Sequence, residues 1–210
     1  SILDTVNIFK PNWLIFDLPY PDMDTSYYPA LRSNGMKIVF IDDFRFTNPG
    51  IDVLLNSNIL APARIEIEKE SQTKYFLGPE YFIFDDTPAT NPSLKNKDRV
   101  NFIITFGGSD PTGITLKVIK ALLTQQWPKA FFKIILGPGY GEHESVYQLI
   151  KNHRQLFGIE VNPASTVSFL QECDFAVCAG GRTAYELLHL EKKFLPIATS
   201  DLEKLMITEF

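Results

Sequence analysis

The sequence predicts an α/β protein built on parallel β-sheets. Short apolar segments alternate with segments of helical composition or loops along most of the 210 residues. Two of the apolar segments, 100–106 and 174–179, run through a glycine pair into a helical segment. A strand buried in a parallel sheet is a nearly continuous apolar run, and both segments fit that description.

The later of the two glycine turns has the features of an anion-binding site. It contains Gly180, Gly181, Arg182 and Thr183, and a predicted helix follows. Glycines let backbone N–H groups approach a ligand closely, and the N–H groups at a helix start favour a phosphate. Thr183 can add a hydroxyl, and Glu186 can accept hydrogen bonds from a sugar diol. A glycine pair also makes a tight strand-to-helix turn without any ligand, and this stretch alone does not choose between the two.

An earlier turn of the same kind strengthens the case for a site. Gly107, Gly108 and Ser109 follow the apolar segment 100–106, and a helix is predicted over 114–123. Two strand, glycine pair, helix units in one half of a chain suggest a site built from several loops at the carboxyl edge of a parallel sheet. We therefore predict that the two turns bind one phosphate-bearing ligand together.

Acidic residues end two predicted strands of the first half. The strand over 12–17 ends at Asp17, and the strand over 36–41 runs into Asp42. In a parallel sheet these side chains would lie at the functional edge, where they could orient a sugar or act as a base. Acidic strand ends also cap the loops that follow them. Asp17 and Asp42 are therefore candidate catalytic residues, with the capping role left open.

Composition and charge exclude several classes of protein. With 45% hydrophobic residues the chain can bury a sizeable core, and no apolar run reaches the ~20 residues that span a bilayer. The formal charge of −5 and the pI of about 5.2 lack the basic face of a nucleic-acid binder. Cys173 and Cys178 are expected to be small core residues in a reducing compartment, which predicts a cytoplasmic protein. Nothing else in the sequence suggests a metal site, and the residues of the predicted anion-binding turns require no metal ion or cofactor.

One polar stretch marks a change of domain. Residues 85–98 contain two prolines and show no hydrophobic periodicity, which is typical of a linker. It predicts an N-terminal domain over 1–95 and a C-terminal domain over 96–210.

Three runs of residues resemble a known family of enzymes. They are NFIITFGGSDP at 101–111, DFAVCAGGRTAYE at 174–186 and YFLGPEY at 75–81. The runs are similar to the UDP-sugar hydrolase of pseudaminic acid biosynthesis and its spore-coat polysaccharide relatives, and more distantly to the N-acetylglucosaminyltransferase that makes lipid II. All belong to the two-domain glycosyltransferase-B architecture. The resemblance implies two Rossmann-like domains of that type, both apparently truncated here.

The resemblance also implies what the predicted site binds. A UDP-linked sugar is the expected ligand, with Glu186 on the ribose hydroxyls. The implied nucleotide-binding residues are Gly107, Gly108, Ser109, Gly180, Gly181, Arg182, Thr183 and Glu186. The implied activity is that of a nucleotide-sugar hydrolase of surface polysaccharide or nonulosonic acid biosynthesis. A glycosyltransferase with the same donor site and a non-catalytic nucleotide-sugar-binding protein stay open as alternatives.

One departure from the family bears on activity. The hydrolases carry a loop of the form Gly-x-Gly-His-x-x-Arg, whose histidine is the proposed catalytic base, and no such run occurs in the 210 residues. The usual glutamine-bearing C-terminal continuation is also not found before Phe210. The expectation is therefore a fragment or variant of such an enzyme, or a protein that binds without reacting.

Overall fold

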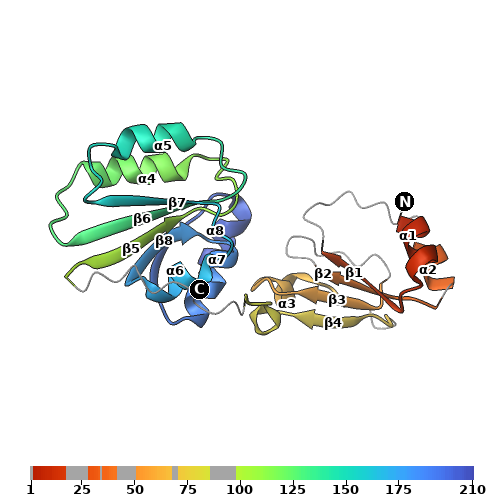
Figure 1. Cartoon of the computed structure of the whole chain (residues 1–210). Helices are drawn as coiled ribbons and strands as arrows, with labels where there is room; N and C mark the ends of the chain where they lie inside the picture. Colours follow the sequence, from red (N-terminus) through yellow and green to blue (C-terminus); the bar gives the residue numbers. More distant parts are fainter. Residues whose placement is uncertain (1, 18–27, 34, 42–50, 68–70, 86–97) are drawn as a thin grey trace. The chain divides into compact units, whose positions relative to one another are not determined.

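The chain forms two compact units, residues 1–83 and 84–210 (Figure 1). The structure is a computed structural model that describes residues 2–17, 28–33, 35–41, 51–67, 71–85 and 98–210. The predicted linker over 85–98 lies almost entirely outside these residues, as does the predicted boundary near residue 96.

The first unit holds a four-stranded parallel sheet in the order β1-β2-β3-β4. Its elements are α1 (Ile2–Phe9), β1 (Trp13–Asp17), α2 (Tyr28–Ser33), β2 (Lys37–Ile41), β3 (Val53–Asn56), α3 (Ala61–Arg64), β4 (Lys74–Leu77) and a 3₁₀ turn, η1 (Pro79–Tyr81). Ile38 and Phe40 of β2 are buried at the two-residue spacing of a strand, and Phe40 pairs in register with Phe16 and Leu54. This row of side chains forms the core of the unit.

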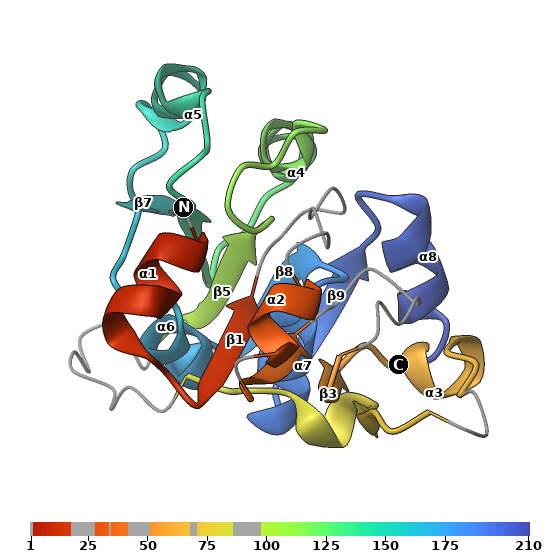
Figure 2. The same cartoon turned by 90° about the vertical axis from the view of Figure 1, so that its right-hand side faces the viewer.

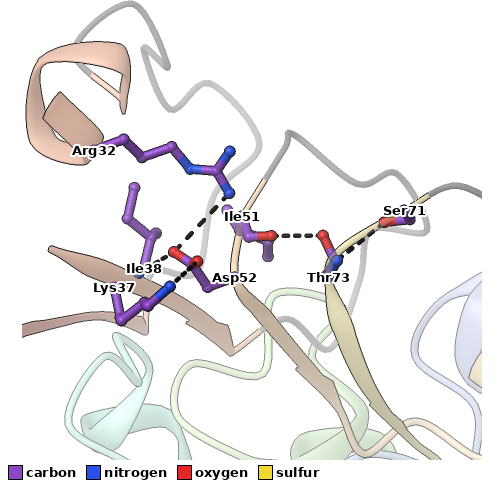
Figure 3. A network of polar contacts seen from close by, with 7 residues as sticks. All are labelled: Arg32, Lys37, Ile38, Ile51, Asp52, Ser71 and Thr73. Atoms are coloured by element: carbon purple, nitrogen blue, oxygen red, sulfur yellow. Dashed lines mark hydrogen bonds and ion pairs between the residues drawn. The ribbon is translucent and has the colours of Figure 1, made fainter. Parts of the chain in front are cut away.

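A polar network ties the strands together where they begin (Figure 3). The carboxylate of Asp52, just before β3, accepts a hydrogen bond of 2.9 Å from the N–H of Ile38 and lies 3.2 Å from Lys37 Nζ and 3.9 Å from Arg32 Nη2. Burial alone would raise the pKa of Asp52. The Ile38 hydrogen bond and the two cations outweigh it, so the pKa lies below its usual value. The network is at the amino edge of the sheet, opposite the strand ends that carry the candidate residues.

The second unit holds a five-stranded parallel sheet in the order β7-β6-β5-β8-β9. Its elements are β5 (Val100–Thr105), α4 (Ile114–Leu123), β6 (Ala130–Leu136), α5 (His143–Ile150), β7 (Phe157–Val161), α6 (Val167–Glu172), β8 (Phe175–Ala179), α7 (Arg182–His189), β9 (Lys193–Ile197) and α8 (Asp201–Ile207). The chain starts in the middle at β5, adds β6 and β7 on one side, and returns to add β8 and β9 on the other. This is the doubly wound arrangement of a Rossmann-like fold.

Both faces of this sheet are covered by helices. Ile104 packs with Ile119 of α4 on one face, whereas its neighbour Ile103 packs with Leu170 of α6 and Leu187 of α7 on the other. Figures 1 and 2 both show α4 and α5 together on one side of the strands. Because successive strand residues enter opposite cores, the strand is apolar throughout rather than alternating. The predicted α/β class with two Rossmann-like sheets is confirmed.

Candidate functional site

The two glycine turns follow neighbouring strands at the point where the second sheet reverses its strand order. Strands β5 and β8 are hydrogen-bonded neighbours, with Thr105 opposite Cys178 near their carboxyl ends. From this pair the chain winds outwards in both directions. Such a switch point leaves a crevice at the carboxyl edge, where ligands of open α/β sheets bind. The turns at 107–109 and 180–183 thus follow adjacent strands at one edge of the sheet, as the sequence predicts.

The first turn exposes its backbone. Gly107, Gly108 and Ser109 are exposed, and Gly107 has a φ of 77°, which favours glycine. A Cβ added at Gly107 or Gly108 would meet no atom within 4 Å. The backbone can therefore be approached closely from outside.

A third glycine turn, which contains Gly137 and Gly139, packs against the first. The N–H of Gly139 donates a hydrogen bond of 2.8 Å to the carbonyl of Gly108. A Cβ added at Gly137 would come within 2.5 Å of the Gly107 carbonyl oxygen and of the Gly108 Cα. Gly137 is therefore a glycine because two loops touch there, and it fixes the shape of the exposed turn.

Asp110 occupies the start of α4. Its buried carboxylate accepts hydrogen bonds from the N–H groups of Ile114 at 3.0 Å and Thr115 at 2.7 Å. These are the first amides of the helix, so the positive end of α4 is already compensated by the chain's own anion. A ligand phosphate at this turn would have to use the backbone of 107–109 rather than the end of α4. Sequence reasoning missed this role, because the usual capping position is the residue directly before the helix, here Gly113, and Asp110 lies three residues earlier.

The second turn leads into α7 and is covered on one side by α8. Gly181 is the N-cap of α7, and Arg182, its first residue, is exposed. A Cβ added at Gly180 would lie 2.8 Å from Ile207 Cδ1 of α8. Close packing of α8 therefore requires glycine at position 180, independently of any ligand. The start of α7 itself carries no side-chain cap from its N-cap residue, and Thr183 beside it is half-buried.

One face of α7 carries the acid that the sequence singles out. Arg182, Glu186 and His189 follow one another at helical spacing. Burial raises the pKa of Glu186, the Arg182 charge opposes this, and the charge of Asp85 adds to it. Asp85 is held nearby because it accepts a 2.8 Å hydrogen bond from Ser165 Oγ. The carboxyl of Glu186 is thus half-buried beside both a cation and a second acid.

The residue before Asp85 packs on the same helix. The ring of Phe84 stacks on His189 with centroids 4.1 Å apart. His189 therefore has a packing role, and His143 likewise lies edge-on against Tyr140.

The structure describes one of the two candidate catalytic residues of the first unit. Asp17 lies at the carboxyl end of β1 and is exposed, as expected. Asp42 lies outside the described residues. Asn56, at the end of β3, is fully buried, and its side chain accepts a hydrogen bond from the N–H of Asn58. Asn56 therefore shapes the loop that leads to α3.

Two further features bear on cofactors and membranes. Within the described ranges, no group of three or more His, Cys, Asp or Glu side chains is arranged to hold a metal ion. None of the helices in that part of the chain is long and apolar enough to cross a bilayer.

Solved structures share this architecture. The chain superposes on Staphylococcus aureus MnaA in complex with UDP with a TM-score of 0.61 at 14% identity, covering 93% of this chain and 59% of that one. A putative UDP-N-acetylglucosamine 2-epimerase of Listeria monocytogenes gives 0.61 at 12%, over 99% and 62%. MurG of Acinetobacter baumannii gives 0.54 at 15%, over 99% and 59%. The fold is of the glycosyltransferase-B type.

Comparison of sequences agrees with the likeness to spore-coat polysaccharide proteins. No protein-family model matches the chain. An uncharacterized protein of Methanocaldococcus jannaschii is 25% identical over 215 residues, which cover 97% of this chain and 44% of that protein. The spore coat polysaccharide biosynthesis protein SpsG of Bacillus subtilis is 27% identical over 142 residues, 65% of this chain and 41% of SpsG. The chain spans less than half the length of either relative.

Proposed function

We propose that the second unit binds a nucleotide sugar, with UDP as its nucleotide, and that the protein serves surface polysaccharide or nonulosonic acid biosynthesis. The observation that carries the proposal is that two glycine turns follow the adjacent strands β5 and β8, where the strand order reverses. In this proposal the N–H groups of the exposed 107–109 turn and of the start of α7 contact the ligand. Together they suit a diphosphate.

The remaining predicted residues fit the other parts of such a ligand. Arg182 supplies a cation on the first turn of α7, and the hydroxyl of Thr183 is adjacent. Glu186 lies one turn further along, where a carboxylate can accept hydrogen bonds from the two ribose hydroxyls. Since Asp110 already compensates α4, we place the weight of phosphate binding on α7 and on the 107–109 backbone.

The comparisons support this ligand class by analogy. One structural neighbour was solved with UDP, and SpsG is named for polysaccharide biosynthesis. Those statements concern the neighbours themselves, and the fold they share with this chain hosts more than one chemistry.

The reaction we propose is hydrolysis of the sugar nucleotide. Water attacks the anomeric carbon or the sugar-linked phosphorus, the bond to the leaving oxygen breaks, and the water proton passes to a base. Backbone N–H groups of the two turns would stabilise the charge that develops on the diphosphate. In a glycosyltransferase, an acceptor hydroxyl would take the place of water at the same donor site.

One experiment separates the three functions that the site allows. The protein is incubated with UDP-sugars, and free UDP and free sugar are followed by NMR. Release of both without an acceptor supports a hydrolase, and release only with an added acceptor supports a transferase. Saturable binding without release supports a binding protein. If no uridine nucleotide binds, the proposal is wrong.

A further inference from the structure

A carboxylate from α8 lies over the second glycine turn. A Cβ added at Gly181 would be 3.4 Å from Glu203 Oε1, and one added at Gly180 would be 3.3 Å from Glu203 Cβ. Burial raises the pKa of Cys178 to about 12, and the charge of Glu203 contributes to this. Glu203 therefore places a negative charge beside the start of α7, where the proposed function puts a phosphate.

The position of this carboxylate is fixed by hydrogen bonds. Oε2 of Glu203 accepts from both the N–H and the hydroxyl of Thr199, at 2.7 Å each. The N–H of Glu203 donates to Ser200 Oγ at 3.2 Å, which closes the first turn of α8. These bonds fix both the carboxylate and the backbone of Glu203. A ligand bound at the turn therefore lies close to the negative charge of Glu203.

We propose that Glu203 makes the site select a diphosphate diester, such as a nucleotide sugar, over the free nucleoside diphosphate. This rests on the proposed function, since it concerns the same phosphate site. In a diester the sugar-linked phosphate carries one negative charge. The terminal phosphate of a free diphosphate carries a second one at pH 7.5, because its second pKa is about 6.

The balance of charges at the turn decides the preference. The N–H groups at the start of α7 and the Arg182 side chain attract the first charge on the phosphate. The second charge is attracted by the same groups but is also repelled by Glu203, which offsets that attraction. For one additional unit charge at a separation of about 5 Å, the repulsion alone is roughly fourfold in affinity in the dielectric of water, and larger near a protein surface. Glu203 would thereby favour substrate and speed the departure of the nucleoside diphosphate product.

The test uses calorimetric titration of the whole chain at pH 7.5 with two ligands. One is UDP, and the other is the diester formed when a single methyl group esterifies the terminal phosphate of UDP. The diester has the charge of a UDP-sugar but no sugar, so it isolates charge from sugar contacts. The wild-type chain should bind the diester about fourfold or more tightly than UDP. In Glu203→Gln, which keeps an acceptor for Thr199, this ratio of affinities should fall about fourfold or more through tighter binding of UDP.

A matched variant controls for loss of charge on the same helix. Asp201→Asn removes an exposed acid from the first turn of α8 and should keep the preference. Equal binding of the two ligands by the wild-type chain would overturn the role of Glu203 and leave the nucleotide site intact, even if Glu203→Gln proves unstable. An unchanged preference in a folded Glu203→Gln variant would overturn it too. Absence of binding by either ligand or by UDP-sugars overturns the proposed function, and this role with it.

Discussion

Glu186 gives the most direct test of nucleotide recognition at the level of a single residue. A charge-assisted hydrogen bond contributes about 1.5–3 kcal/mol, so Glu186→Ala should lower UDP affinity roughly ten- to hundredfold. Glu186→Gln should lower it less, because the amide keeps one acceptor. Pyrophosphate, which has no ribose, should bind equally well to all three proteins.

Calorimetry with UDP and pyrophosphate measures this prediction, and Glu144→Ala on the exposed side of α5 serves as its control. If both Glu186 variants bound UDP normally but melted earlier, the acid would be a structural partner of Arg182 instead.

Gly108 is the glycine at which phosphate access can be tested cleanly. A Cβ there meets no atom within 4 Å, so Gly108→Val should fold while its side chain blocks the approach of a phosphate, and UDP affinity should fall about tenfold or more. Gly141 lies two residues after Gly139, and a Cβ there also meets no atom within 4 Å. Gly141→Val should therefore bind UDP like the wild type.

The other glycines of the two turns are less informative targets. Gly107 has a positive φ, so valine there strains the backbone itself. Valine at Gly180 would collide with Ile207, and lost affinity would then reflect a displaced α8. Normal UDP affinity in a folded Gly108→Val variant would remove the 107–109 turn from the site.

At the level of elements, the Asp52 network makes the first sheet sensitive to acid. The pKa of Asp52 is lower in the folded chain than in the unfolded one, so its stabilisation is complete above the unfolded value of about 3.9 and is lost as pH falls through the folded value. Asp52→Asn should therefore cost about 1 kcal/mol of unfolding free energy at pH 7 and less near pH 2.

Urea denaturation at the two pH values, followed for the first unit, checks this expectation. Glu66→Gln, an exposed acid after α3, should cost nothing at either pH. An equal loss for Asp52→Asn at both pH values would show that the carboxylate charge is not what stabilises the strands.

Elements with a strong local pattern were predictable from sequence, and those defined by their neighbours were not. The helix over 114–123 and the strand before Gly180 are present as expected, because each combines apolar composition with a glycine boundary. β4 was not predicted, because it is short and pairs with β3 only after the chain has passed through α3. α8 was also missed, although Ser200 and Glu203 have the spacing of a capping box.

The same distinction applies to the candidate site. The glycine turns were predictable as a pair, because strand-to-helix turns in a parallel sheet share one edge. The compensation of α4 by Asp110 and the approach of Glu203 to Gly181 were not, because they depend on side-chain positions that no spacing specifies.

At the scale of the 210-residue chain, we predict binding of nucleotide sugar and slow hydrolysis. No Gly-x-Gly-His-x-x-Arg run occurs in the 210 residues, and His143 and His189 pack against aromatic rings. A positioned general base typically supplies ~10²–10⁴ in rate, so the chain should hydrolyse UDP-sugars slower than a base-equipped hydrolase by about that factor.

A side-by-side hydrolysis assay of the wild type, Asp17→Asn and Asp42→Asn tests this prediction. Rapid hydrolysis that either substitution abolishes would move the catalytic base into the residues of this chain and contradict the prediction.

The anion that caps α4 has a practical consequence for work in solution. Asp110 is attached to the helix it compensates, so no concentration of buffer ion displaces it in the way that a bound sulfate can be displaced. Of the two glycine turns, only the one that leads into α7 therefore leaves a helix start for phosphate or sulfate to compete for. Nucleotide affinities measured in such buffers would be weakened by single-site competition, and a chloride buffer of low ionic strength gives the value closest to the intrinsic one.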